Sequence, residues 1–558
     1  MTRGGDTVPV SGAAAARQDD APRVPVLIIG GGPVGLILAI DLARRGVRSI
    51  VLDETDGTIT FPTGENLNTR TMEHFRQWGL ADRIRYSGFP ADYRRNVRFV
   101  TRVLGYQLTV FERTSNSEPM PQEAAVSPEW SIWCPKFFLD PTLRAYAATL
   151  PEADVRYGWR CEAVSQSDAG VVADVVEVAT GRRQRLAARY LVGCDGGASV
   201  VRRSVGIELE GTFAEGQNLG IFFRAPTLLA TNPYGSASQY WLGNRDGVGP
   251  VSAVDGRERW RLSIEYPRDK LPQMDPAQVV RAALGADLPF EILHVRPWAG
   301  HRVVAARYRA GRVFLAGDSC HMMWPRGGFG LNTGAGDAFN LSWKLAAALQ
   351  GWGGAGLLDS YDVERRPVGW RNVNRAAENR AAEIAVPIPE QLEADDERGA
   401  RVRAQVAEHI ERTRRKEWNT LGIQLGYRYE SAICVPDGTL PPSDDPAVYE
   451  PTTRPGSRAP HAWLADGRST LDLFGRGFVL LRLRARDADT TGLEAAARAV
   501  GLPLAVVDLD DPAVAALYER RLVLVRPDGH VAWRADAPPA DAAAVVARVR
   551  GCLVEPAV

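Results

Sequence analysis

The sequence feature that most constrains this chain is a glycine-rich loop between an apolar segment and a helical one. Residues 24–29 form a continuous apolar run that is short enough for a buried parallel strand. The loop that follows places Gly30, Gly32 and Gly35 in the spacing G-x-G-x-x-G, and residues 36–45 then have helical character. Glycines at these positions allow a tight turn and let backbone N–H groups at a helix N-terminus approach a pyrophosphate. A glycine-rich turn that holds no ligand is the alternative.

A second strand and an acidic residue complete this unit. Residues 47–52 are again mostly apolar and lead into Asp53 and Glu54, and Asp53 lies 23 positions after Gly30. An acid at the end of the second strand, about 20 residues after the loop, binds a ribose hydroxyl in dinucleotide-binding folds. The combination of strand, loop, helix and acid therefore predicts a βαβ unit that binds a dinucleotide.

Composition and charge exclude several other classes of protein. At about 150 residues per domain, the 558 residues are enough for three to four domains, and 67 Lys and Arg balance 67 Asp and Glu. A neutral chain is a poor nucleic-acid binder, and no run of 18 or more apolar residues predicts a membrane span. The six cysteines form no Cys-x-x-Cys pair, so we expect neither a zinc site nor a dithiol redox motif. We expect a soluble cytoplasmic protein without a metal, and the sequence leaves open whether it forms a homo-oligomer.

The rest of the chain predicts a mixed α/β organisation. Residues 1–23 are rich in Gly, Ala, Asp and Pro, which is typical of a disordered tail. Residues 219–266 alternate short strands with Gly and Asn turns, which favours an antiparallel sheet. We expect a helix to begin at Pro141. The Pro- and Asp-rich residues 436–460 predict a linker before a last α/β unit.

Two further segments carry a resemblance to a known family. One is YLVGCDGGASVVRRSVGI, residues 190–207, and the other is RVFLAGDSCHMMWPRGGFGLNTGAGDAFNLSWKLAAAL, residues 312–349. Together with the first loop, they resemble the group A FAD-dependent aromatic monooxygenases, which have the para-hydroxybenzoate hydroxylase fold. Phenol hydroxylase-like enzymes and actinobacterial natural-product tailoring hydroxylases are the nearest types. The resemblance covers almost the whole chain from Val24 onward.

The resemblance implies how FAD is held. Asp318 is expected to hydrogen-bond the ribityl chain, and the loop at residues 325–332 is expected to pass over the isoalloxazine ring. The dipole of the helix that follows would favour negative charge on the reduced flavin. The catalytic chemistry is carried by the flavin, with Pro325, Gly327 and Gly328 in the loop over it. The full set of implied cofactor-binding residues is Gly30, Gly32, Pro33, Val34, Gly35, Asp53, Glu54, Arg70, Lys136, Asp195, Gly317, Asp318, Pro325, Gly328, Gly330, Leu331 and Asn332.

The chain departs from the family pattern at three places. Many relatives carry an arginine where this chain has Phe-Pro-Thr-Gly at residues 61–64, although Arg70 is retained. Lys136 stands where relatives often have glutamine, near the FAD phosphates or the ribityl chain. Arg326 replaces a small hydroxyl residue in the flavin loop, and it either faces solvent or contacts the substrate or the nicotinamide.

The predicted middle sheet supplies the substrate candidates. These are Phe222, Arg224, Tyr240 and Trp241, together with Arg326 from the flavin loop. With Ser252 and Arg261 added, the expected lining is mostly apolar or neutral, and at least half of these residues are expected to be ordinary sheet packing. A substrate with two carboxylates would need more convergent arginines. We therefore favour a neutral phenol, hydroxypyridine or aromatic polyketide ring.

The resemblance implies a monooxygenase that hydroxylates an electron-rich aromatic ring in natural-product biosynthesis. FAD would take a hydride from NAD(P)H, react with O2 to give a C4a-hydroperoxide, and transfer one oxygen atom. No second G-x-G-x-x-G follows a strand, so NADPH is expected to bind transiently. Two alternatives stay open: Baeyer–Villiger or epoxidising chemistry on the same scaffold, and a non-catalytic FAD- or substrate-binding protein.

The resemblance also implies the division of the chain into domains. The last segment is similar to the thioredoxin-like domain of phenol hydroxylases, without its Cys-x-x-Cys. The expected parts are a Rossmann-like FAD-binding domain (residues 24–88, 140–215 and 298–385), an antiparallel-sheet substrate domain (residues 89–139 and 216–297), a helical segment and linker (residues 386–455), and the thioredoxin-like domain (residues 456–558).

Overall fold

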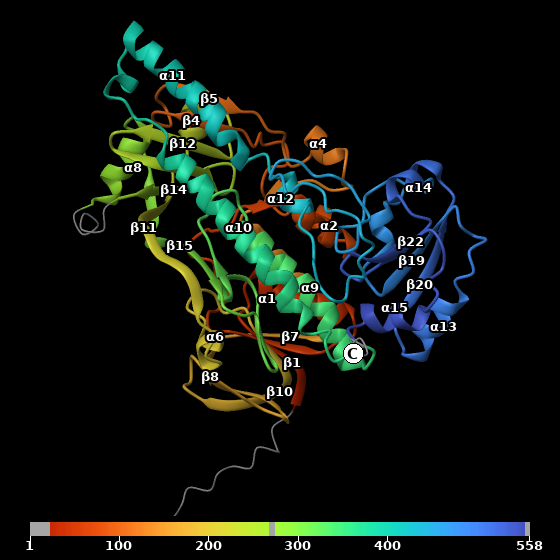
Figure 1. The fold of residues 1–558 in the computed structure, drawn as a ribbon. Coiled ribbons are helices and arrows are strands. Elements are labelled where there is room, and N and C mark those ends of the chain that lie inside the picture. The colour runs from red at the N-terminus through yellow and green to blue at the C-terminus, as the bar shows by residue number, and fades with distance from the viewer. Residues whose placement is uncertain (1–22, 267–273, 553–558) are drawn as a thin grey trace, which may run out of the picture.

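The computed structural model describes residues 23–266 and 274–552, and most of the predicted N-terminal tail lies outside these ranges. The described residues form two eight-stranded sheets, a four-stranded sheet and a two-stranded ladder. Figure 1 shows the two large sheets at opposite ends of the main body, with helices α9 (Gly330–Gln350) and α10 (Ser360–Ile384) running between them. This arrangement confirms the predicted mixed α/β class.

The first large sheet carries the predicted βαβ unit. Its main path has the order β16-β17-β10-β1-β2-β7, and the pairs β10–β17, β1–β10, β1–β2 and β2–β7 are parallel. Helix α1 (Pro33–Arg44) follows β1 and packs against α9. The strands are β1 (Arg23–Ile29), β2 (Ser49–Asp53), β7 (Ala153–Tyr157), β8 (Trp159–Ser167), β9 (Gly170–Glu177), β10 (Arg183–Gly193), β16 (Arg309–Ala310) and β17 (Val313–Leu315). In β1, β2 and β17 consecutive residues are buried, so both faces of the sheet centre are covered, as in a parallel sheet between helices.

The second large sheet is mostly antiparallel, as the turn-rich sequence predicts. Its order is β18-β15-β11-β14-β13-β12-β4-β5, in which only the β12–β4 pair is parallel. The strands are β4 (Val97–Val100), β5 (Gln107–Phe111), β11 (Leu209–Arg224), β12 (Gln239–Asn244), β13 (Gly247–Ala253), β14 (Arg259–Glu265), β15 (Glu291–Ala305) and β18 (His321–Met322). The long strands β11 and β15 run from one end of the body to the other (Figure 1). The expected domain boundaries after residues 215 and 297 therefore fall inside continuous strands.

The remaining helices connect and cover these sheets. Helix α5 begins at Lys136 rather than at Pro141, which lies inside it, so the predicted helix start is wrong. Pro135, immediately before the helix, is the proline that marks its beginning. The other helices of this part are α2 (Thr69–Gln77), α3 (Ala81–Arg85), α4 (Pro121–Ala124), α6 (Val200–Ser204), α7 (Leu228–Thr231), α8 (Pro276–Leu284), α11 (Glu397–Arg414) and α12 (Leu421–Leu425), and β3 (Asn66–Leu67) pairs with β6 (Ile132–Trp133). None of the helices in the described ranges is long and apolar enough to cross a membrane.

The C-terminal part forms a separate small α/β unit, which Figure 1 draws in blue. Its sheet has the order β20-β19-β21-β22, with β19 and β20 parallel and the other pairs antiparallel. The elements are β19 (Phe478–Leu483), α13 (Thr491–Ala499), β20 (Leu504–Leu509), α14 (Pro512–Tyr518), β21 (Leu522–Val525), β22 (Val531–Ala535) and α15 (Ala542–Val549). Residues 426–469, all described, contain neither helix nor named strand.

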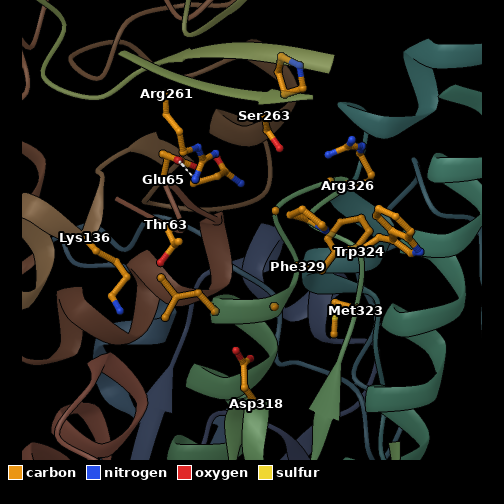
Figure 2. A pocket seen from close by; sticks show the side chains of 18 of the residues that line it. Thr63, Glu65, Lys136, Arg261, Ser263, Asp318, Met323, Trp324, Arg326 and Phe329 are labelled. Atoms are coloured by element: carbon orange, nitrogen blue, oxygen red, sulfur yellow. Dashed lines mark ion pairs between the residues drawn. The ribbon is translucent and has the colours of Figure 1, made fainter. Parts of the chain in front are cut away.

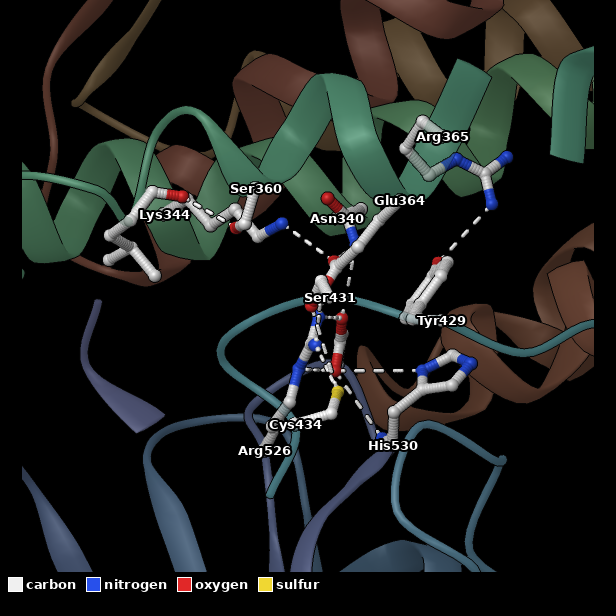
Figure 3. Close-up of polar contacts among 12 residues, drawn as sticks. Asn340, Lys344, Ser360, Glu364, Arg365, Tyr429, Ser431, Cys434, Arg526 and His530 are labelled. Carbon is white, nitrogen blue, oxygen red and sulfur yellow. Dashed lines mark hydrogen bonds and ion pairs between the residues drawn. The ribbon is translucent and has the colours of Figure 1, made fainter. Parts of the chain in front are cut away.

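Buried charges join this unit to the main body. The Glu364 carboxylate on α10 accepts hydrogen bonds from Arg526 of the C-terminal unit and from Lys344 on α9, at 2.6 and 2.7 Å (Figure 3). A second buried pair links Glu73 on α2 to Arg458, with Nε 3.0 Å from the carboxylate. Because buried ion pairs need close partners to offset their lost hydration, these contacts fix how the unit sits on the main body.

The same interface predicts a loss of stability in mild acid. Burial lowers the pKa of His530, which lies against the ring of Tyr429, from 6.5 to about 4. Between these two values the unfolded chain binds a proton that the folded protein does not, so stability falls as the pH drops through this window. The slope from one such group is about 1.4 kcal/mol per pH unit. Burial also lowers the pKa values of His74 and His461, so the free energy of unfolding, measured with denaturant, should fall more steeply than this between pH 7 and 4, and His530→Phe should reduce the slope by about 1.4 kcal/mol per pH unit. An unchanged slope in the variant would contradict the assignment.

Candidate active site

A cavity of about 670 Å³ lies between the two large sheets. One end is lined by the start of α1 and by the segment between β17 and α9, and the other end by strands of the second sheet. Figure 2 shows Asp318 and Lys136 entering it from one side and Arg261, Ser263 and Arg326 from the other. A single cavity therefore joins the predicted dinucleotide loop to the predicted substrate sheet.

The glycine loop before α1 leaves an open space at the helix N-terminus. Gly30 has φ +108°, and a Cβ there would lie 2.2 Å from the carbonyl oxygen of Cys194, so only glycine fits. A Cβ on Gly35 would lie 1.9 Å from the Gly30 oxygen, which explains the close packing of loop and helix. A Cβ on Gly32, by contrast, would meet no atom of the described chain within 4 Å. No side chain of the described chain caps the helix at Gly32, so its first N–H groups can bind an anion.

The acid after β2 lies next to this loop. Asp53 Oδ2 accepts the Gly31 N–H at 2.7 Å, and Oδ1 accepts the Thr55 N–H at 2.9 Å. Glu54, the neighbouring candidate, is exposed. The structure therefore places Asp53, rather than Glu54, beside the glycine loop.

The segment between β17 and α9 supplies the rest of this end of the cavity. Asp318 is accessible from the cavity and forms no side-chain hydrogen bond with the described residues. Gly327, with φ +92°, turns the loop under the ring of Phe329, and the loop leads into α9 at Gly330. No side chain of the described ranges caps α9, so this helix also presents free N–H groups to the cavity.

Comparison with known proteins decides the family. Residues 23–376 match the model described as "FAD binding domain", and residues 452–553 match "Aromatic-ring hydroxylase, C-terminal". The chain belongs to the FAD-dependent aromatic-ring hydroxylases. It is similar to the FAD-dependent monooxygenase apdD of Emericella nidulans, with 34% identity over 92% of this chain and 87% of that protein. It is also similar to the tetracenomycin B2 monooxygenase-dioxygenase of Streptomyces olivaceus, with 34% identity over 94% of this chain and 98% of that protein.

A solved structure agrees with this assignment. The rebeccamycin biosynthetic enzyme RebC with reduced flavin superposes with a TM-score of 0.89 and 40% identity, over 95% of this chain and 99% of that chain. The protein is thus an FAD-dependent monooxygenase, which uses O2 and NAD(P)H. The geometry fits the cofactor. The open space at Gly32 and the uncapped N-terminus of α1 match its pyrophosphate. The uncapped N-terminus of α9 matches the reduced ring, and the accessible Asp318 carboxylate matches the ribityl hydroxyls.

Several residues expected to contact FAD in this hydroxylase have their side chains engaged elsewhere. The Arg70 guanidinium donates to Glu73 and to the backbone oxygen of Asp528, outside the cavity, so the expectation of a cofactor contact is corrected. The Asn332 amide is fully used in bonds to Asn66, Asn68, Thr71 and Gly328, and the Asp195 carboxylate accepts from Ser199 and Val201. These contacts shape the loops. The other expected lining residues, Gly32, Pro33, Val34, Lys136, Asp318, Pro325, Gly327, Gly328, Gly330 and Leu331, do border the cavity.

The four substrate candidates from the second sheet lie outside the cavity lining. Phe222 packs behind the lining residue Phe61, and Arg224 is exposed and paired with Glu258 at 2.8 Å. The Tyr240 hydroxyl donates to the Gly235 oxygen in the core of the sheet. Trp241 lies under the guanidinium of Arg326, 5.0 Å from its ring centre. These four expectations are corrected for the same reason. Which side chains of a strand face the cavity depends on the elements packed against the sheet, and the local sequence does not reveal those elements.

Arg326 lies on the cavity wall and is only 3% exposed, so the solvent-facing alternative is wrong. Its Nη2 donates to Glu383 on α10 at 2.8 Å, and Nε contacts the other carboxylate oxygen. Burial alone would raise the pKa of Glu383, but the guanidinium groups of Arg326 and Arg380 hold that pKa below its ordinary value. The pair therefore stays ionised and anchors the flavin loop to α10.

Most residues of the lining are apolar or neutral, as expected, but its charged residues do not balance. Among the described residues that line the cavity, six are Lys or Arg and three are Asp or Glu, a net charge of +3 with histidine neutral. Two of the six, Arg95 and Arg113, lie in residues 89–139, the first part of the expected substrate domain, from which no substrate candidate was predicted. No signal in the local sequence could have identified them, because the β4–β5 hairpin brings them together.

Proposed function

We propose that this enzyme hydroxylates an electron-rich aromatic ring of a natural-product intermediate bound at the second-sheet end of the cavity. The observation that carries the proposal is the continuity of that cavity with the glycine loop and with Asp318. The wall between the two ends is aromatic, with Phe61, Trp133, Trp298, Trp324, Phe329 and Trp418 in the lining. Such a lining packs against a flat ring and excludes water from it.

Bound FAD supplies the hydride acceptance from NAD(P)H and the activation of O2. We propose that the N–H groups at the start of α1 bind the pyrophosphate and that Asp53 binds a ribose hydroxyl. Asp318 would accept hydrogen bonds from the ribityl chain. The free N–H groups at the start of α9 would stabilise negative charge at the ring edge. Lys136, 3.5 Å from Asp140, lies within the same cavity and would add positive charge near the phosphates.

We further propose a structural role for the C-terminal unit. Its four strands with three flanking helices are consistent with a thioredoxin-like fold, but it contains no Cys-x-x-Cys. Its strongest contacts with the rest of the protein are the buried pairs of Arg526 with Glu364 and of Arg458 with Glu73. Those carboxylates lie on α10 and α2, outside the cavity, which supports a role in holding the main body together.

Anaerobic stopped-flow reduction of the flavin by NADPH tests the proposed function. Phenols, hydroxypyridines, hydroxynaphthalenes and hydroxyanthraquinones would be compared with buffer alone. We expect one class to accelerate the bleaching of the flavin absorbance at least tenfold, and aerobic turnover of that compound to yield the ring-hydroxylated product. Fast reduction in buffer alone would contradict the proposal, and a ring-expanded lactone or an epoxide would instead indicate the alternative oxygen-insertion chemistry.

A further inference from the structure

We propose that Arg95 and Arg113 form a carboxylate-binding end of the cavity, so that the aromatic substrate of this enzyme carries a carboxylate group. The inference rests on the proposed function and specifies its substrate class. It replaces the neutral ring that the sequence alone favoured. Three observations carry it: the position of the two arginines, their lack of a charged partner, and a buried hydroxyl beside them.

The two arginines lie just beyond the same end of a β-hairpin, one on each side of it. Val97 on β4 pairs with Phe111 on β5 in the antiparallel register. Arg95 lies two residues before β4 and Arg113 two residues after β5, where the Arg95 N–H donates to the Thr114 carbonyl oxygen, and both arginines line the cavity together with Val97. Like charges at facing positions of a strand pair repel each other and destabilise the hairpin. An anion bound between them would turn that repulsion into two attractive contacts.

Neither arginine has a charged partner in the described chain. Arg95 is 3% exposed, and its guanidinium donates only to neutral oxygens: the carbonyl and hydroxyl oxygens of Thr114, at 2.9 and 3.2 Å, and the carbonyl oxygen of Ser131. Arg113 donates to the carbonyl oxygen of Trp418 at 3.1 Å. No carboxylate in residues 23–266 or 274–552 lies within 4.0 Å of either one.

Three other charged groups of the lining are already engaged. Arg261 pairs with Glu65 at 2.7 Å, and Arg326 pairs with Glu383. Glu417, a lining carboxylate, pairs with Arg414 at 2.6 Å. Glu123, a carboxylate whose charge acts on both arginines, accepts from Thr69, from the Ser131 N–H and from the Met120 N–H. Burial and then the charge of Arg113 lower the pKa of Arg95 to about 9, which reflects how poorly this guanidinium is compensated.

A buried hydroxyl completes the end of the cavity. Ser131 is 2% exposed and lines the cavity, yet its Oγ finds no hydrogen-bond partner among the described residues. A buried hydroxyl without a partner is unfavourable, because it has lost its water contacts. A carboxylate has four lone-pair positions and matches one hydroxyl and two guanidinium groups. The two guanidinium groups present donors only and the hydroxyl can donate as well, which favours an anionic group over a neutral one.

Paired acids and esters test this inference. The binding of 3-hydroxy-2-naphthoic acid, 1-hydroxy-2-naphthoic acid and their methyl esters to the FAD-loaded enzyme would be measured from the change in flavin absorbance. The wild type should bind each acid at least tenfold more tightly than its ester. Arg113→Gln and Ser131→Ala should reduce that ratio to near one and three, respectively, without weakening ester binding. Arg224→Gln, an exposed arginine of the same sheet paired with Glu258, is the matched control and should leave the ratio unchanged.

Several outcomes would overturn the inference. One is an acid that binds no more tightly than its ester, including failure of both to bind. A second is an equal loss of acid and ester binding in Arg113→Gln. A third is a raised KM for NADPH with the acid preference retained, which would assign the arginines to a cofactor phosphate. Arg113→Gln should also keep the wild-type melting temperature, because it relieves repulsion; a large drop would mark a structural arginine. If an ester accelerates flavin reduction as well as its acid does, this inference fails while the proposed function stands.

Discussion

Glu364→Gln is expected to lower the free energy of unfolding by about 3–5 kcal/mol, because it leaves the buried Lys344 without a carboxylate partner and Arg526 with Asp528 alone. The Glu364 carboxylate accepts from both terminal nitrogens of Arg526, at 2.6 and 2.9 Å, and from Lys344 at 2.7 Å. It also accepts from Asn340 at 2.8 Å and from Ser431 at 2.6 Å (Figure 3). The side chains of the three charged residues are fully buried. Glutamine keeps the shape but removes the negative charge.

The neighbouring exposed pair provides the control for this prediction. Glu430 pairs with Arg454 at 2.9 Å, but its side chain is 63% exposed. Water already solvates that pair, so Glu430→Gln should change the stability by less than about 1 kcal/mol. Urea unfolding of both variants with FAD present would compare them directly. If both variants lose the same small amount of unfolding free energy, the buried cluster stabilises the protein no more than an exposed ion pair does.

The cluster also predicts a second response to acid. The guanidinium of Arg526 and the ammonium group of Lys344 overcome the effect of burial and lower the pKa of Glu364 to about 2. In the unfolded chain this carboxyl has its ordinary pKa near 4.5. The stabilisation is therefore complete above pH 4.5 and is lost as the pH falls toward 2. Glu364→Gln should remove this part of the acid sensitivity while leaving the part that His530 causes at higher pH.

The sequence predicted those features whose signals are local. The glycine loop, its flanking strand and helix, and Asp53 occupy one stretch of about thirty residues, and each has a steric or electrostatic requirement that residue type alone reveals. The antiparallel sheet and the linker were predicted for the same reason, since turn residues mark them. The start of α5 was missed because two prolines, Pro135 and Pro141, lie six positions apart and either can stand at a helix N-terminus.

Features that depend on distant partners could not be predicted. Arg70 donates to the backbone of Asp528, 458 positions later, so no local pattern could show that it supports the C-terminal unit instead of the cofactor. The charge of the cavity was misjudged similarly. Arg95 and Arg113 become neighbours only through the β4–β5 hairpin, and whether they are paired depends on carboxylates from the whole fold. The composition shows that positive and negative residues are equal in number over the whole chain. It does not show that positive residues are in excess in the cavity lining.

The second large effect is expected at the glycine loop: Gly32→Ala should weaken FAD binding about 100-fold, the loss of one or two charge-assisted hydrogen bonds. The backbone at Gly32 has φ −71° and ψ −178°, an extended conformation that alanine adopts without strain. An added Cβ would enter space that the described chain leaves open at the N-terminus of α1. Because this is the space in which we place the pyrophosphate, the methyl group should push the phosphates away from the helix N–H groups. Fluorescence titration of the apoprotein with FAD measures the loss.

Two other glycines separate a ligand effect from a folding effect. Gly492→Ala, in α13 of the C-terminal unit, adds a Cβ at an ordinary contact distance of 3.6 Å and should leave FAD binding unchanged. Gly35→Ala places its Cβ 1.9 Å from the Gly30 oxygen and should destabilise the apoprotein itself. The stability of the Gly32→Ala apoprotein should equal that of the Gly492→Ala apoprotein within about 1 kcal/mol, which is the cost of alanine at a helix N-cap. The two variants should differ only when FAD is added. If Gly32→Ala instead unfolds like Gly35→Ala, or binds FAD normally, the pyrophosphate does not lie at the start of α1.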